Sequence, residues 1–150
     1  MLMLGFRYWG LDAEKNVMPM IKLKPEIANI IRNFHLGSVI LFRYNLIDSA
    51  QTVNLISSLQ QAHNNLPLFI SVDQEGGYVT RLRDGTEMLG KYGIRLVQHA
   101  ISNLVKLVGI IYGYELTQLG FNFNFVPVVD INNNQSNPIM ACVLIQIGQN

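Results

Sequence analysis

The stretch SVDQEGGYVTRLRDG, residues 71–85, concentrates acids, adjacent glycines and arginines in a chain of 150 residues of which only 14% are charged. Asp73 comes directly after the apolar run PLFISV, which predicts a strand, and ligands bind at the carboxyl ends of parallel strands. Arg81 and Arg83 can fold back toward the acids. The stretch therefore predicts either a loop that binds a polar ligand or a charged loop closed by internal salt bridges.

Composition and charge exclude several classes of protein. Apolar residues make up 49% of the chain, which predicts one domain with a packed core. The net charge of +1 with no basic run favours neither nucleic acid nor an anionic membrane surface as a partner. The longest apolar block, residues 139–147, is shorter than the roughly 20 residues of a membrane-spanning helix. The amino terminus lacks the layout of a secretory signal, and the single cysteine, Cys142, cannot form an internal disulfide. We therefore expect a soluble cytoplasmic protein.

Hydrophobic periodicity indicates alternating strands and helices. Strand patterns lie at residues 1–10, 38–42, 67–73 and 121–131. Helical patterns lie at residues 25–37, 48–63 and 97–119. This order requires parallel strands joined by crossovers. It predicts an α/β fold: either the first half of a (β/α)8 barrel, with about four parallel strands and three helices, or a small doubly wound sheet.

Local signals predict where the helices begin, end and are buried. Asp48 should cap the second helix, with Gln51 completing a capping box. Glycines at positions 37 and 120 should end the first and third helices. Residues predicted to lie on buried helix faces include Phe34, Val53, Ile56 and Leu59. The three histidines, at positions 35, 63 and 99, lie near helix ends without a second ligand at metal spacing, so we expect no metal site.

Three segments carry a resemblance to a known family: GSVILF, PLFISVDQEGGYVTRLR and ELTQLGFNFNFVPVVDINNN. In this order and spacing they resemble the amino-terminal half of glycoside hydrolase family 3, in its bacterial β-N-acetylhexosaminidase branch. The resemblance runs from about residue 2 to residue 138, within a partial barrel domain over residues 1–150. It implies a glycosidase that releases β-linked N-acetylglucosamine from cell-wall fragments in peptidoglycan recycling, without metal or organic cofactor.

The resemblance also implies roles for individual residues. The family residues that match Asp73 and Arg81 bind the sugar next to the scissile bond, and a carboxylate suits this role because it accepts charge-assisted hydroxyl hydrogen bonds. Glu75 should brace the loop, while Gly76 and Gly77 should shape its backbone. Asp130 is a minor candidate, as a substrate contact or as an anchor for the Asn-rich loop.

The catalytic groups of the family have no match in these 150 residues. A retaining glycosidase needs a carboxylate nucleophile about 5–5.5 Å from its acid/base group. The resemblance places the acid/base, a histidine in a Lys-His motif, and the nucleophile, an aspartate, beyond this sequence. The sugar-binding arginine expected shortly after Asn137-Pro138 is also missing, because the sequence there reads IMACVLIQIGQN.

We therefore expect a truncated or frame-shifted chain with no catalytic residue and little or no hydrolysis on its own. Half a barrel leaves two sheet edges unpaired, which predicts self-association. Two alternatives are a non-catalytic sugar-binding or interaction module and an unrelated doubly wound α/β domain.

Overall fold

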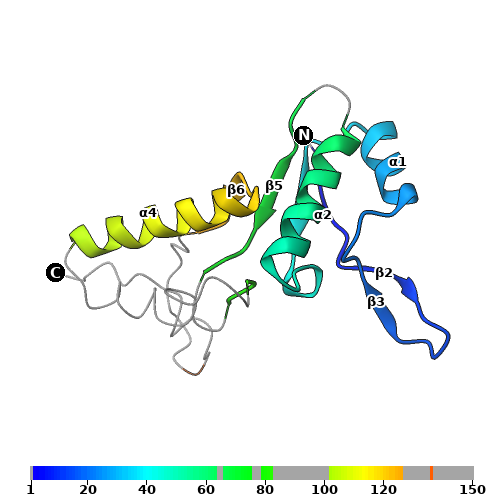
Figure 1. The fold of residues 1–150 in the computed structure, drawn as a ribbon, viewed down its shortest axis with the longest axis horizontal. Helices are drawn as coiled ribbons and strands as arrows, with labels where there is room; N and C mark the ends of the chain where they lie inside the picture. Colours follow the sequence, from blue (N-terminus) through cyan, green and yellow to red (C-terminus); the bar gives the residue numbers. More distant parts are fainter. Residues whose placement is uncertain (1, 64–65, 76–78, 83–101, 127–135, 137–150) are drawn as a thin grey trace.

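The computed structural model describes residues 2–63, 66–75, 79–82, 102–126 and 136 (Figure 1). The strands are β1 (Met3–Gly5), β2 (Tyr8–Leu11), β3 (Val17–Pro19), β4 (Ser38–Leu41), β5 (Phe69–Val72) and β6 (Phe123–Asn124). The helices are α1 (Pro25–Asn33), the 3-10 turn η1 (Arg43–Asn45), α2 (Ser49–Ala62) and α4 (Ser102–Leu119). In the part of the chain that the structure describes, no helix is both long and apolar enough to span a bilayer.

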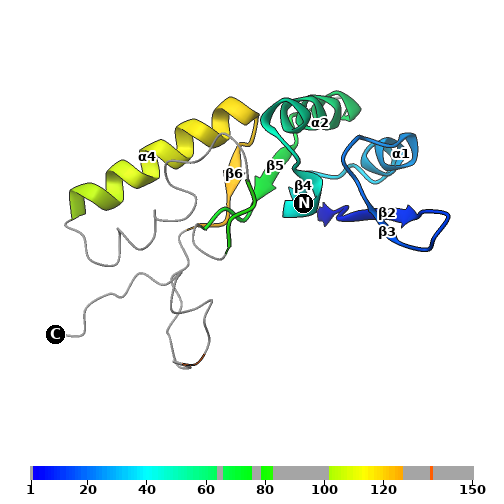
Figure 2. The same ribbon diagram turned by 60° about the horizontal axis from the view of Figure 1, so that its bottom comes forward.

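Four of the described strands form one parallel sheet in the order β1-β4-β5-β6. The spatial order follows the chain order, and α1, α2 and α4 all lie on the same side of the sheet (Figure 2). A doubly wound sheet carries helices on both faces and reverses its strand order. The prediction of a partial (β/α)8 barrel is therefore confirmed, and the doubly wound alternative is wrong.

The core lies between the sheet and the helix layer. Val39 and Leu41 of β4 and Ile70 and Val72 of β5 are fully buried and belong to one hydrophobic cluster with residues of α1 and α2. These side chains share a face because Val39 pairs with Ile70 and Leu41 with Val72 in the parallel register. The apolar side chains of these β-branched strands therefore form the face of the sheet that packs against the helices.

The start of α2 confirms the predicted helix cap at Asp48, but Gln51 does not complete the predicted capping box. The Asp48 side chain accepts a hydrogen bond of 2.7 Å from the backbone N–H of Gln51. Gln51 Oε1 accepts from the backbone N–H of Ile47, one residue before the partner that a capping box requires. Gln51 Nε2 donates instead to the carbonyls of Ile21 and Asn45. Gln51 thus ties two loops to the helix start.

Two predictions about α1 and α2 are wrong. Helix α1 ends at Asn33 rather than at Gly37, because His35 adopts a left-handed φ of 49° while the Gly37 N–H donates to the carbonyl of Leu2. Phe34, at the C-cap, is consequently 69% exposed. Val53 is also exposed, and Leu55 lies in the buried face of α2 with Ile56 and Leu59.

The end of α4 is as predicted. Gly120 follows the last helical residue with a φ of +94°, and a Cβ atom there would lie 2.8 Å from Ile56 Cγ2. Glycine is therefore required both by the backbone conformation and by the close approach of α2.

An antiparallel hairpin replaces part of the predicted first strand. Strand β1 ends at Gly5, and β2 pairs with β3. Asp12 closes the turn by accepting from the backbone N–H groups of Glu14 and Asn16, at 2.9 and 2.8 Å. The buried Asn45 holds the hairpin against the barrel wall, because its Nδ2 donates to backbone carbonyls on both sides of the hairpin, Phe6 and Arg7 before it and Met20 after it.

Candidate functional site

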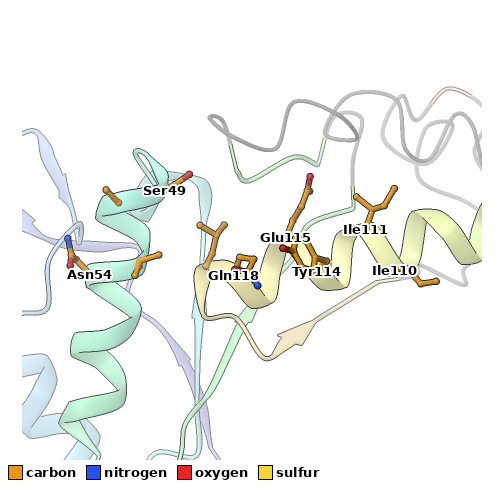
Figure 3. A pocket seen from close by; sticks show the side chains of 10 residues that line it. Ser49, Asn54, Ile110, Ile111, Tyr114, Glu115 and Gln118 are labelled. Atoms are coloured by element: carbon orange, nitrogen blue, oxygen red, sulfur yellow. The ribbon is translucent and has the colours of Figure 1, made fainter.

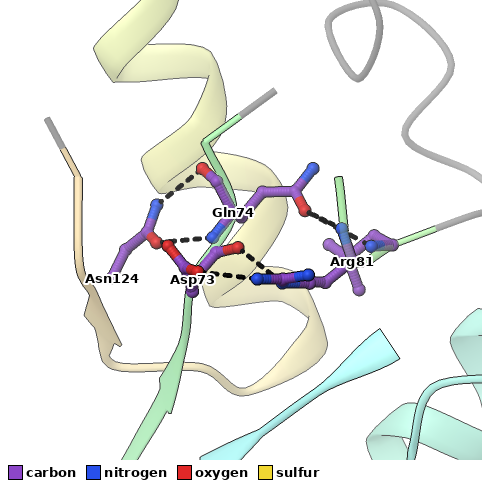
Figure 4. A network of polar contacts seen from close by, with 5 residues as sticks. Asp73, Gln74, Arg81 and Asn124 are labelled. Atoms are coloured by element: carbon purple, nitrogen blue, oxygen red, sulfur yellow. Dashed lines mark hydrogen bonds and ion pairs between the residues drawn. The ribbon is translucent and has the colours of Figure 1, made fainter. Parts of the chain in front are cut away.

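Asp73 and Arg81 meet at the carboxyl end of β5 (Figure 4). Asp73 is the first residue after the strand, and Arg81 returns to it with two hydrogen bonds. Arg81 Nη2 donates to Asp73 Oδ2 at 2.7 Å, and Arg81 Nε donates to the Asp73 carbonyl at 3.1 Å. About a quarter of each side chain is exposed, at 26% for Arg81 and 25% for Asp73. The two groups are therefore held together yet open to a polar ligand, and both interpretations of the loop predict this ion pair.

Gln74 and Asn124 surround the pair with amide contacts that the sequence did not reveal. Gln74 is 1% exposed, and its Oε1 accepts from the backbone N–H groups of Arg81 and Leu82, at 2.7 and 3.3 Å. Asn124 Oδ1 accepts from the Gln74 N–H at 3.1 Å, and Asn124 Nδ2 donates to the Gln74 carbonyl at 3.4 Å. The only sequence signal was the polar residue alternating with phenylalanine in FNFNF.

Glu75 lies beside Asp73 on the buried side of the loop. Its side chain is buried, and its backbone N–H donates to the Val79 carbonyl at 3.0 Å. Burial, together with the hydrogen bond to Asp73 and the negative charge of Asp73, raises the pKa of Glu75 to about 7, and the positive charge of Arg81 opposes this rise. A protonated Glu75 can therefore donate to the Asp73 carboxylate near neutral pH. Its role as a brace for the loop stays a prediction.

Several predicted residues lie outside the part of the chain that the structure describes: Gly76, Gly77, Arg83, His99 and Asp130. Of the other two histidines, His35 lies in the turn after α1, and His63 Nδ1 accepts from the Leu66 N–H at 3.2 Å. Among the described residues, no group of three or more histidine, cysteine or acidic side chains is arranged to hold a metal ion.

Aromatic side chains occupy the neighbouring strand ends. The Arg7 guanidinium, after β1, lies 4.2 Å from the centre of the Phe42 ring, after β4. Tyr8 and Tyr44 are both exposed, with ring centres 5.6 Å apart. Because β1, β4 and β5 are parallel, these residues follow the same edge of the sheet as Asp73. Sequence reasoning missed them, although each lies within a few residues of the end of a predicted strand.

A groove of about 1080 Å³ lies elsewhere, between α2 and α4 in the helix layer (Figure 3). Val53, Ile110, Ile111, Tyr114 and Leu119 give it a largely apolar lining that includes neither Asp73 nor Arg81. The groove explains why Val53 is exposed. It lacks the convergent charges of the strand-end site, so we assign the polar site to the end of β5.

A parallel sheet with helices on one side and polar residues at its carboxyl edge is the arrangement of a partial α/β barrel. The model of the glycosyl hydrolase family 3 N terminal domain matches residues 11–142, and the chain belongs to this family. The resemblance drawn from the three sequence segments is thereby confirmed.

Individual relatives agree with this assignment. Beta-hexosaminidase A of Pseudoalteromonas piscicida is 36% identical over 93% of the chain, and the Beta-hexosaminidase of Tolumonas auensis is 33% identical over 77%. The solved family 3 beta-N-acetylglucosaminidase of Paenibacillus sp. str. FPU-7 superposes on 92% of the chain with a TM-score of 0.74 and 36% identity. The chain spans 25%, 34% and 24% of these three proteins.

Proposed function

We propose that the chain supplies the sugar-binding amino-terminal part of a glycosidase that releases β-linked N-acetylglucosamine. The observation that carries the proposal is the partly exposed pair of Asp73 and Arg81 at the carboxyl end of β5. The relatives support the choice of sugar, since they are named as hexosaminidases and as a beta-N-acetylglucosaminidase. Asp73 accepts hydrogen bonds from the sugar hydroxyls, and Arg81 donates to the same sugar.

The wider reaction follows from the family resemblance. The complete site cleaves peptidoglycan fragments with retention, through a covalent glycosyl-enzyme intermediate. The acid/base and the nucleophile of that mechanism are not among the 150 residues, so the chain alone gives little or no hydrolysis. Its own contribution is to bind and orient the terminal sugar. The cytoplasmic location stays a prediction.

The direct test measures binding and turnover on the same purified chain. We expect binding of N-acetylglucosamine by calorimetry, loss of that binding in Asp73→Asn, and no release of chromophore from a chromogenic N-acetylglucosaminide. Binding without hydrolysis supports a sugar-binding part. Turnover that disappears in Asp73→Asn would contradict the inactivity of the chain, and absence of binding would contradict the assignment of the sugar site.

Self-association is a second part of the proposal. β1 and β6 are the outer strands of the described sheet, and the face away from the helices carries three phenylalanines that are exposed by 42 to 44%: Phe69, Phe123 and Phe125. Phe123 contacts the other two rings at 6.1 and 4.9 Å between centres. An eight-stranded barrel buries this face, and a second copy offers four further strands to cover it.

Sedimentation of the purified chain tests this association. We expect a dimer or larger species, and a shift toward monomer in Phe123→Glu, because the charge lies in the centre of the exposed aromatic face. Phe34→Glu is a matched control, since Phe34 is exposed at the C-cap of α1, in the helix layer on the other side of the sheet (Figure 2). A chain that sediments as a monomer and melts cooperatively would contradict the association.

A further inference from the structure

Gln74 holds the backbone of the segment that carries Arg81. Its Oε1 accepts from two consecutive N–H groups, those of Arg81 at 2.7 Å and of Leu82 at 3.3 Å. Because both partners are donors, they fix which end of the amide is the oxygen. Gln74 Nε2 is buried and has no hydrogen-bond partner among the described residues. Within the described residues, the carbonyl oxygen is therefore the atom through which this side chain makes hydrogen bonds.

Gln74 is itself fixed from the next strand. Asn124, the last residue of β6, accepts from the Gln74 N–H and donates to the Gln74 carbonyl, at 3.1 and 3.4 Å. The contacts form a chain from β6 through Gln74 to the backbone of Arg81 (Figure 4). Arg81 then returns to Asp73 through its guanidinium. The loop is thus tied at both its backbone and its charged side chain.

We propose that Gln74 is a positioning residue for the sugar site: its buried oxygen sets the backbone of Arg81 so that the guanidinium lies against Asp73. An arginine on an untethered loop must lose more conformational freedom to reach its partner. The buried Nε2, which has no hydrogen-bond partner in the described part of the chain, carries a free-energy cost. The cost is offset by the two bonds to Oε1, which pair backbone groups that a packing residue would leave unpaired.

The restricted conformation of Arg81 follows from these contacts alone, whereas the effect on sugar binding rests on the proposed function. The experiment therefore observes Arg81 directly, by NMR of the free 150-residue chain. It follows the Nε–H signal of Arg81 and the hydrogen-exchange protection of the Arg81 and Leu82 amides.

Three variants separate positioning from folding. Gln74→Met keeps the length of the side chain and removes the oxygen, so we expect the Arg81 amide to lose at least about tenfold in protection and its Nε–H signal to broaden. Gln74→Glu keeps an acceptor oxygen and should retain both signals. Gln60→Met is the matched control, because Gln60 makes the same kind of bond, to Leu68 N at 2.9 Å, at the opposite end of β5. It should leave the Arg81 signals unchanged.

The affinity for N-acetylglucosamine is the second quantity to measure in the same variants. We expect Gln74→Met to weaken the binding of N-acetylglucosamine by about tenfold and Gln60→Met to leave it unchanged in the folded protein. If the Gln74→Met protein loses the dispersed core signals of β4 and β5, Gln74→Asn, which is one methylene too short, replaces it with the same expectations.

Unchanged Arg81 signals in folded Gln74→Met, or in Gln74→Asn where it replaces that variant, would overturn the positioning role, even if the unmodified chain binds sugar. Failure of the proposed function has a different signature. In that case the unmodified chain binds no N-acetylglucosamine, while Gln74→Met still releases Arg81.

Discussion

Glutamine and asparagine amides contact both ends of β5, but the groups around them differ between the two ends. At the amino end, the Leu68 carbonyl accepts from Gln60 Nε2 and Asn122 Nδ2, both at 2.9 Å, and the Ile70 N–H donates to Asn122 Oδ1 at 2.7 Å. At the carboxyl end, the amide contacts of Gln74 and Asn124 range from 2.7 Å, to the Arg81 N–H, up to 3.4 Å, and the buried Gln74 Nε2 has no partner among the described residues.

The difference lies in what the amides hold. At the amino end they close a backbone edge with neutral partners and short bonds, which serves stability. At the carboxyl end they hold an acid, an arginine and a second acid whose pKa is raised to about 7. In (β/α)8 barrels the carboxyl face carries the active site and the amino face carries stability. The charged side chains at the carboxyl end of β5 support the proposal that this end carries the site.

The largest expected effect is on binding at the carboxyl end. Asp73→Ala removes the proposed acceptor for the sugar hydroxyls and leaves the Arg81 guanidinium without its carboxylate partner, so we expect affinity for N-acetylglucosamine to fall by about 10- to 100-fold. Calorimetry measures this effect, and Asn122→Ala is the control at the other end of the strand. Equal affinities for Asp73→Ala and the unmodified chain would contradict the proposal that the carboxyl end of β5 binds the sugar.

The next effect is on stability at the amino end. Asn122→Ala leaves the Ile70 N–H unpaired inside the sheet, so we expect the free energy of unfolding to fall by about 2 kcal/mol. Asn124→Ala breaks longer bonds and should cost about 1 kcal/mol or less. Urea unfolding of both variants checks this order. A larger loss of unfolding free energy for Asn124→Ala than for Asn122→Ala would contradict the claim that the amino end of β5 contributes more to stability.

The turn that delivers Asn122 to β5 gives a third test. Gly120→Ala forces a side chain into a φ of +94° and places its Cβ 2.8 Å from Ile56 Cγ2, so we expect a loss of about 1–2 kcal/mol. Gly113→Ala is the matched control, since a Cβ there meets no atom within 4 Å, and it should stabilise α4 by up to about 1 kcal/mol. Thermal melts distinguish the two, and two losses of the same size would contradict the account of Gly120.

The last effect concerns the pH dependence of stability. Because folding raises the pKa of Glu75 from 4.5 to about 7, the folded chain binds a proton that the unfolded chain has released between these values. The stabilising contribution is complete below about pH 4.5 and is lost as the pH rises through about 7. Glu75→Gln imitates the protonated form and should flatten this part of the stability curve. An unchanged pH dependence of urea unfolding would show that Glu75 does not titrate in this way.

Much of this molecule is readable from sequence where one local signal decides the outcome. Asp48, Gly120 and the β-branched strands predicted a cap, a helix end and a buried parallel sheet, because each depends on neighbouring residues alone. The end of α1 and the exposure of Val53 depend on tertiary packing, which local patterns do not contain. The charged stretch itself singled out Asp73 and Arg81, and the family resemblance supplied the sugar-binding roles proposed for them. Gln74 and Asn124, in contrast, meet through contacts between residues 50 positions apart in the chain.

The central claim is that the carboxyl end of β5 is a sugar site, and an NMR titration of the 150-residue chain with N-acetylglucosamine tests it most directly. The account predicts shift changes in the amides of residues 73–75 and 81–82, saturating with added sugar, and none in Leu68 or Ile70. Shifts confined to the amino end or to the groove between α2 and α4, or no shifts at any sugar concentration, would contradict it.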